Sequence, residues 1–120
     1  MVTTRELGKI AEGLAEKHLL KLGYEIKETN WYYGHLELDI IAQDGDELVI
    51  VEVKSRSGIR YEHPSEAVTN GKIKRIVEAA DAYIQENNID LETRFDVITV
   101  IFIRQKYELE HFKDAFYPTM

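Results

Sequence analysis

The segment that decides the fold runs over residues 36–54 and reads LELDIIAQDGDELVIVEVK. Aliphatic residues alternate with other residues in both of its halves, which is the period of two that marks β-strands. Asp44-Gly45 lies between the halves, and Asp-Gly between two such segments is a strong signal for a two-residue hairpin turn. We therefore expect strands over residues 36–42 and 47–54, joined as an antiparallel hairpin.

This turn also predicts a register. If Asp44 and Gly45 form the turn, Gln43 faces Asp46, and Glu52 lies opposite Glu37 and diagonally from Asp39. Cross-strand partners share a face of the sheet. Four side chains are then expected to project from one side: Glu37, Asp39, Glu52 and Lys54.

Three carboxylates gathered on one face repel one another unless water or a cation separates them. An all-oxygen set without Cys or His suits a hard ion such as Mg²⁺ or Mn²⁺. Lys54 lies about 7 Å beyond Glu52 along the strand, by the usual rise per residue, and can reach a metal-bound water. A metal and a lysine together can activate water and neutralise the charge that develops in phosphodiester cleavage.

The same pattern has a less specific interpretation. Charged residues at strand ends are usually only solvated, and Asp followed by Glu-x-Lys is a degenerate motif. The chain contains a second Glu-x-Lys at residues 25–27, with no acidic residue before it on a paired strand. The register of the hairpin favours the metal site. Glu12, on the flank of an expected helix, is either a further ligand or a solvated helix residue.

The segments around the hairpin predict an α/β fold. Apolar residues at spacings of three and four indicate helices over residues 5–22 and 68–84. Further strands are expected over residues 24–31, 95–103 and 107–112. The segment 95–103 is apolar on both faces and belongs inside the sheet, whereas residues 55–66 have the composition of a loop. The order α-β-β-β-α-β-β predicts one domain, residues 1–120, an α/β sandwich around a central mixed sheet.

Composition narrows the class of protein. The chain has 120 residues, no cysteine and a net charge of −7. Disulfides and thiolate-held metals are excluded, and nothing indicates a signal peptide or a membrane span, so we expect a cytoplasmic protein. The acidic balance argues against a protein that coats nucleic acid non-specifically, because phosphate affinity comes mainly from clustered Lys and Arg.

The charge is nevertheless unevenly distributed. Residues 54–75 hold six cations and two anions, a net +4, which leaves −11 over the rest of the chain. The candidates for binding a phosphate backbone are Arg56, Arg60, Lys72 and Arg75. The alternative is a solvated helix face. Lys72 and Arg75 are preferred because a spacing of three places them on one side of a helix.

With these residues identified, the chain resembles the YraN family of predicted bacterial endonucleases over about residues 7–117. The resemblance rests on a set of short motifs that are specific only together. They are Gly8-x-x-x-Glu12-x-x-Ala15, Gly23-Tyr24, Asn30-Trp31, residues 37–42 (ELDIIA), Leu48 to Arg56, Glu66-Ala67-Val68, Lys72-x-x-Arg75, residues 94–97 (RFDV) and Ala115-Phe116.

The resemblance implies a restriction-endonuclease-like fold, similar to that of archaeal Holliday-junction resolvases. It implies that Asp39, Glu52 and Lys54 match the nuclease signature of the family, that Glu12 is its helical metal-binding Glu, and that Glu37 is its neighbouring acidic residue. The chain departs from the family at two positions. Leu36 and Ala11 stand where the family usually has Gly, which is a residue that lets a backbone approach phosphate closely.

These observations lead to one main hypothesis and two alternatives. The main one is an endonuclease dependent on Mg²⁺ or Mn²⁺ that hydrolyses DNA, with branched or single-strand-containing DNA as its partner, and a homodimer is compatible with it. The first alternative is a nuclease-fold module that binds such DNA for a repair or recombination partner with little or no cleavage. The second is a protein-interaction role for the acidic surface. Trp31, Tyr32 and Tyr33 either stack on unpaired bases or, as we favour, pack at the sheet edge.

Overall fold

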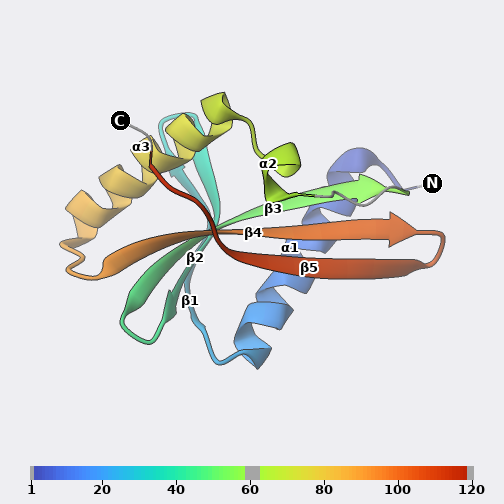
Figure 1. The fold of residues 1–120 in the computed structure, drawn as a ribbon, viewed down its shortest axis with the longest axis horizontal. Helices are drawn as coiled ribbons and strands as arrows, with labels where there is room; N and C mark the ends of the chain where they lie inside the picture. Colours follow the sequence, from blue (N-terminus) through green and yellow to red (C-terminus); the bar gives the residue numbers. More distant parts are fainter. Residues whose placement is uncertain (1, 59–62, 119–120) are drawn as a thin grey trace.

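The computed structural model describes residues 2–58 and 63–118 and contains one mixed five-stranded sheet with a helix on each face (Figure 1). The strands follow one another in the order β1-β2-β3-β4-β5; β3 and β4 are parallel, and all other neighbours are antiparallel. The elements are α1 (Thr4–Lys21), β1 (Glu25–Tyr33), β2 (Leu36–Asp44), β3 (Glu47–Ser57), α2 (Pro64–Ala67), α3 (Asn70–Asn87), β4 (Glu92–Ile103) and β5 (Lys106–Phe116).

The expected architecture is confirmed with one addition. The loop expected over residues 55–66 is shortened from both sides, because β3 continues to Ser57 and the short helix α2 begins at Pro64. Proline is tolerated in the first turn of a helix, where its missing N–H group has no partner to lose. Among the described residues, no helix has the length and apolar character needed to cross a membrane.

Each long helix begins at a capping threonine and covers one face of the sheet. Thr3 accepts a hydrogen bond from the Glu6 backbone and Glu6 accepts one from the Thr3 backbone, both at 3.1 Å, which forms a capping box. Helix α1 buries Ala11, Ala15 and Leu19 against the sheet. Its small alanines allow the helix axis to approach the strands closely. We call this side of the sheet the α1 face.

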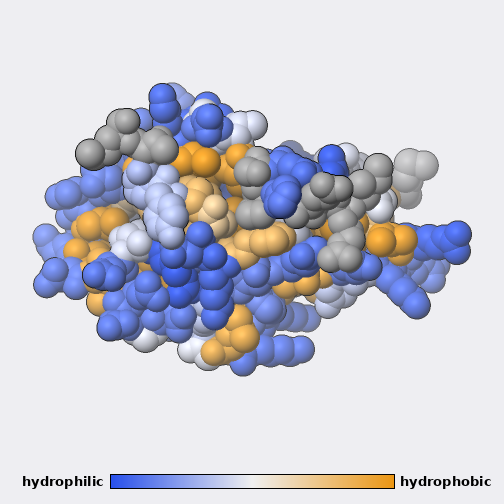
Figure 2. Space-filling model, in the orientation of Figure 1, coloured by the Kyte–Doolittle hydropathy of each residue, from blue (hydrophilic) through white to orange (hydrophobic). Residues whose placement is uncertain are grey.

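The opposite side, the α3 face, is covered by the long helix α3. Ile76, Ala80 and Tyr83 of that helix pack on strand residues that include Ile50 and Val97. Figure 2 shows hydrophobic side chains gathered between α3 and the sheet, with a largely hydrophilic surface around them. Strands β3 and β4 are therefore buried on both faces, which confirms the expected position of residues 95–103 inside the sheet.

The turn of the β2–β3 hairpin differs from the expected one. Residues 45 and 46 form it, and Asp44 pairs with Glu47, so the predicted turn and register are wrong and the pairing is displaced by two residues. Gly45 has a φ of 62°, and Asp46 is not in a positive-φ conformation. Positive φ at the first turn residue alone is typical of a type II′ turn, which prefers Gly there. Continued beyond Ile40 and Val51, the observed register sets Asp39, and not Glu37, across from Glu52.

The sheet divides beyond that point. Pairing between β2 and β3 ends at Ile40 and Val51, whereas β3 stays paired with β4 as far as Ser57. Strand β2 stays paired with β1 to the end of their own hairpin. In Figure 1 the β1–β2 hairpin, drawn in cyan, lies beside α3 while β3, β4 and β5 extend away from it. We call the place where β2 and β3 part the fork.

A buried ionic network closes the opposite end of the sheet. Arg94 donates hydrogen bonds to Asp96 through Nε and Nη2, to Asp44 and Glu47 through Nη1, and to the Tyr24 hydroxyl. Asp96 is fully buried and also accepts from His111 Nε2 at 2.7 Å. Burial raises the pKa of Asp96, but the hydrogen bonds from His111, Arg94 and the Asp114 amide together hold it below its ordinary value of 3.8.

The lowered pKa of Asp96 gives a prediction about acid stability. A carboxylate whose pKa is lower in the folded state stabilises the fold above its unfolded pKa, near 3.8, and loses that contribution as the pH falls further. Asp96→Asn should therefore reduce the free energy of unfolding at pH 7 by about 3 kcal/mol, since it leaves Arg94 with one carboxylate fewer. In urea denaturation the difference from wild type should shrink as the pH falls to about 3. Asp46→Asn, in the exposed turn, is the control, and a difference that stays constant with pH would contradict the prediction.

Candidate active site

Asp39 and Glu52 meet at the fork. Where β2 leaves β3, the backbone N–H of Val53 donates to Asp39 Oδ2 at 2.9 Å, so the carboxyl group takes the place of a strand partner. The side chains of Asp39 and Glu52 lie within hydrogen-bonding reach of each other, and this proximity contributes to the raised pKa of Asp39. Glu52 is 4% exposed. The fork therefore holds an acidic pair at the edge of the core.

Electrostatics at this pair favour the binding of a positive charge. Burial raises the pKa of Asp39 well above its ordinary value, and the hydrogen bond and charge of Glu52 raise it further, although the Val53 N–H group partly opposes the shift. Two buried carboxyl groups in contact cannot both ionise cheaply without a cation. In the absence of a cation the pair keeps a proton.

One oxygen of the pair lacks a hydrogen bond. Glu52 Oε2 is buried and has no hydrogen-bond partner, although Lys72 Nζ of α3 lies 3.4 Å away, within the range of an ion pair. A buried acceptor left without a hydrogen bond is unusual and costly. Lys72 was expected from the sequence to contact phosphate, and the structure places its ammonium group beside Glu52.

A second acidic group lies next to the pair on the α1 face. Asn30 Nδ2 donates to Glu12 Oε1 at 3.1 Å and to Glu37 Oε2 at 3.0 Å, which links α1 to β2 through β1. Burial raises the pKa of Glu12; the hydrogen bond from Asn30 opposes this, and the charges of Asp39 and Glu37 add to it. Glu12, Glu37 and Asp39 are therefore electrostatically coupled.

The expectation that four side chains share one face is wrong for Glu37. Leu38 packs on the α3 face and Ile40 on the α1 face, although they are two residues apart, so the alternation of β2 is interrupted at Asp39. Glu37 is adjacent to Leu38 and hydrogen-bonds toward α1 through Asn30. Glu52 and Lys54 keep the expected common face of β3, because no irregularity separates them.

Asn30 is the site residue that sequence reasoning missed. The pairs on either side of it, Thr29 with Ile40 and Trp31 with Leu38, set it across from Asp39. Its φ is 49°, a left-handed conformation that Asn adopts more readily than most residues. The available signal was an Asn inside a segment that otherwise has the composition of a strand, where Asn is uncommon.

The remaining candidates lie around the fork. Lys54 of β3 is half-buried and pairs with Thr99 of β4, whereas Arg56 and Arg75 are exposed. Arg75 lines a hollow of about 220 Å³ together with Lys72 and Glu37, close to the acidic residues. Arg60 lies outside the described residues.

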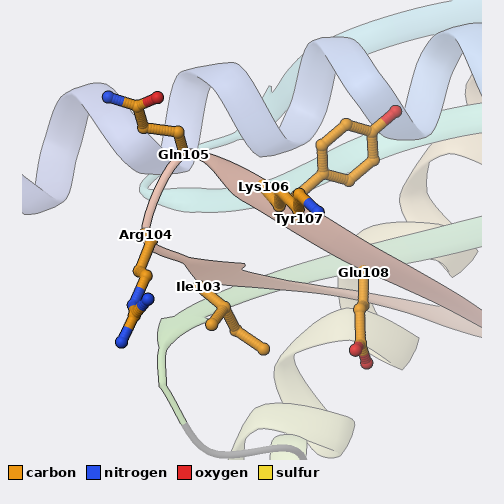
Figure 3. Close-up of a pocket in the computed structure, with 6 residues that line it drawn as sticks. All are labelled: Ile103, Arg104, Gln105, Lys106, Tyr107 and Glu108. Atoms are coloured by element: carbon orange, nitrogen blue, oxygen red, sulfur yellow. The ribbon is translucent and has the colours of Figure 1, made fainter.

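Only some of the hollows in the surface lie beside the acidic residues of the fork. A wide hollow of about 790 Å³ is formed by the turn between β4 and β5, where Ile103 and Tyr107 are exposed (Figure 3). Its lining contains none of the carboxylates of the fork. A hollow of about 210 Å³ is lined by Glu12, Asn30 and Asp39, so it reaches one carboxyl group of the acidic pair.

The donor set fits a hard divalent cation bound by few protein ligands. Within residues 2–58 and 63–118, no three acidic or His side chains are placed to enclose a metal ion. Mg²⁺ does not require such a cage, since it keeps several waters and is commonly held by one or two carboxylates. Asp39 and Glu52 Oε2, which has an ion pair with Lys72 but no hydrogen bond, offer that smaller set, with Glu12 and Glu37 near enough to interact electrostatically.

Comparisons with known proteins identify the family of the chain. The model of a family described as "Uncharacterised protein family UPF0102" matches residues 11–100. A UPF0102 protein of Bacteroides thetaiotaomicron is 49% identical over 120 residues, covering 100% of this chain and 99% of its own length, and one of Flavobacterium psychrophilum is 47% identical over 117 residues, covering 98% of each chain.

A solved structure supports the fold class. The Holliday junction resolvase Hjc of the archaeal hyperthermophile Archaeoglobus fulgidus superposes with a TM-score of 0.52 at 17% identity, covering 89% of this chain and 72% of that one. At this level of identity the similarity establishes the fold alone. The restriction-endonuclease-like fold expected from the sequence is therefore confirmed.

The acidic pair predicts opposite effects of one substitution with and without metal. Asp39→Asn keeps an acceptor for the Val53 N–H group and can donate to Glu52, so the metal-free variant should be at least as stable as wild type. Mg²⁺ or Mn²⁺ at a hundred times its dissociation constant should stabilise wild type by about 2.7 kcal/mol, or roughly 10 °C in melting temperature, because it binds only the folded state. Asp39→Asn should lose that rise.

The control is Asp81→Asn, on the exposed surface of α3, which should respond to metal as wild type does. Thermal melts with and without each metal provide the measurement. Equal shifts in wild type and in Asp39→Asn would place metal binding elsewhere.

Proposed function

Because this chain belongs to the UPF0102 family, the YraN family that its sequence resembles, we propose that it is a divalent-metal-dependent nuclease that hydrolyses phosphodiester bonds of DNA. The observation that carries the proposal is the acidic pair at the fork, with one buried carboxylate oxygen of Glu52 free of hydrogen bonds. A buried acceptor without a hydrogen bond, beside a carboxyl group whose pKa is raised, is costly to keep unless a ligand completes it. The resolvase-like fold is consistent with this chemistry.

Asp39 and Glu52 would hold Mg²⁺ or Mn²⁺, and Glu12 and Glu37 would add negative charge beside them. A divalent ion in such a site lowers the pKa of bound water and polarises the phosphoryl oxygens. The protein orients its own ligands firmly. The Val53 N–H group fixes Asp39, and Asn30 fixes Glu12 and Glu37 relative to each other.

Lys54 would orient the attacking water and stabilise negative charge on the phosphate. Its ammonium group is a donor without lone pairs, so it can orient a water molecule and stabilise negative charge on a phosphate but cannot act as a ligand of the metal. Its position two residues after Glu52 directs it to the same face of β3. Thr99 of β4 lies beside it and is buried, so that the backbone beneath Lys54 belongs to the rigid interior of the sheet.

One observation favours a second function, a DNA-binding module with little or no cleavage. The Lys72 ammonium group lies 3.4 Å from Glu52 Oε2. It therefore already places a positive charge beside the carboxylate that would bind a metal. A site compensated in this way can persist without metal. DNA phosphates would then meet Lys72 and Arg75 in place of a hydrolytic centre.

The proposal predicts cleavage that depends on metal and on Asp39. Purified protein with Mg²⁺ or Mn²⁺ should cut at least one of four DNA forms: plasmid, single strand, flap and four-way junction. Asp39→Asn should abolish the cleavage, and a chelator should do the same. Binding of these DNAs without cleavage of any of them would support the binding module instead.

Lys54 separates chemistry from metal binding. Lys54→Ala should keep the metal-induced rise in melting temperature, while the rate of cleavage falls on the order of 10²-fold or more, as is typical when a group that stabilises developing charge is removed. Lys21→Ala, at the exposed end of α1, is the control and should cut at the wild-type rate. Equal cleavage by Lys54→Ala would remove Lys54 from the mechanism.

Phosphate contacts predict a strong dependence of DNA affinity on salt. Arg75→Ala should lower the slope of log affinity against log salt concentration by about 0.7–0.9, the contribution of one phosphate contact. Arg104→Ala, in the β4–β5 turn, should leave the slope unchanged. Titrations at several salt concentrations measure it, and a wild-type slope in Arg75→Ala would exclude this arginine from the phosphate path.

A further inference from the structure

Three aromatic residues end strand β1, and they lie in different surroundings. Trp31 packs edge-on against Tyr83 of α3, with ring centroids 5.2 Å apart, and joins the core of the α3 face. Tyr32 and Tyr33 remain outside, and 61% of the Tyr32 surface is exposed. Trp31 thus has the edge-packing role that the sequence favoured, whereas burial does not account for Tyr32.

Tyr32 stands between two hollows. One, of about 220 Å³, is lined by Tyr32 together with Lys72, Arg75 and Glu37. The other, of about 400 Å³, is lined by Tyr32 together with two cations and two carboxylates: Arg5, Lys9, Glu12 and Glu37. The ring therefore forms a wall shared by both hollows, and the wall adjoins the acidic residues of the candidate active site.

Two cationic side chains lie on each side of this ring. Lys72 and Arg75 from the start of α3 lie on one side, and Arg5 and Lys9 from the start of α1 lie on the other. Glu37 lines both hollows with the ring, and its proximity raises the pKa of the Tyr32 hydroxyl. Cations on both sides of an exposed aromatic ring form the arrangement with which proteins bind single-stranded nucleic acid.

Stacking on such a ring discriminates between paired and unpaired bases. Every base has an aromatic face that can stack on tyrosine, so the contact tolerates any sequence. A base inside a duplex already stacks on its neighbours and must leave the helix before it can reach a protein side chain, which costs free energy. An exposed tyrosine beside a hydrolytic site therefore favours strands that are already unpaired.

We propose that Tyr32 is a stacking platform for an unpaired base of the DNA strand, with the phosphates on its two sides bound by Arg5 and Lys9 and by Lys72 and Arg75. The inference rests on the proposed function and specifies its substrate: DNA that contains a single-stranded segment or an open branch point. The strand would run from one hollow to the other past the ring, with its backbone near Glu37 and Asp39.

The test measures binding and stacking without metal, so that it does not depend on cleavage. A single-stranded oligonucleotide carrying one 2-aminopurine, and the same strand in a duplex, are titrated with protein in the presence of a chelator. The 2-aminopurine fluorescence reports stacking, and anisotropy of a terminal dye reports affinity. Wild type is compared with Tyr32→Phe, Tyr32→Leu and Tyr107→Leu, the last changing an exposed tyrosine in β5.

Wild type should quench the 2-aminopurine and bind the single strand more tightly than the duplex. Tyr32→Leu should lose the quenching and about tenfold of the single-strand affinity, while its duplex affinity stays unchanged. Tyr32→Phe keeps the ring without the hydroxyl and should behave as wild type, and so should Tyr107→Leu. Circular dichroism and the melting temperature confirm that each variant is folded.

The outcomes separate this inference from the function on which it rests. If wild type binds and cuts DNA and Tyr32→Leu quenches and binds as wild type does, the stacking platform is refuted and the nuclease proposal stands. Equal loss of single-strand and duplex affinity in Tyr32→Leu also refutes it. If wild type binds no DNA form, both proposals fail.

Discussion

The structure depends on the end of pairing between β2 and β3 at Ile40 and Val51. A strand that loses its neighbour leaves backbone N–H groups without partners, and such groups must be satisfied near the core. Asp39 satisfies the first of them by accepting from Val53. The carboxyl group thus has a structural reason to be buried, and its burial brings it to Glu52. Strand β4 makes this possible, because it continues to pair with β3 after β2 has left.

This arrangement places two mutually repelling carboxyl groups at the edge of the core. Asp39 and Glu52 share a proton, Glu52 Oε2 lacks a hydrogen bond, and Lys72 gives partial compensation from α3. A fully apolar fork would be more stable, since buried ionic groups seldom repay their desolvation. Charged groups kept in a core at such a cost are typical of functional sites. The acidic pair is therefore a better candidate for the functional site than the larger hollow at the β4–β5 turn.

The element order and the convergence of Asp39 with Glu52 could be predicted from the sequence, because hydrophobic periodicity and a Gly-containing turn are local signals. The register could not, since both Asp44-Gly45 and Gly45-Asp46 are plausible turns and the choice is stabilised by Arg94, which is distant in the sequence. The face on which Glu37 lies and the role of Asn30 depend on the interrupted alternation of β2 at Asp39 and on the left-handed conformation of Asn30. The pattern of apolar residues in the sequence does not indicate either feature. The position of Lys72 depends on how α3 packs.

The Arg94 network has a consequence for the order in which the chain can fold. It ties the β2–β3 turn, through Asp44 and Glu47, to a strand that follows α2 and α3, and through Asp96 to His111 of β5. Parallel pairing of β3 with β4 needs the same long crossover, and such distant contacts form late and slowly. A ribosome therefore releases the carboxylates of residues 37–52 well before the strand that buries them. The emerging amino-terminal half carries the acidic residues but not yet the site that they form.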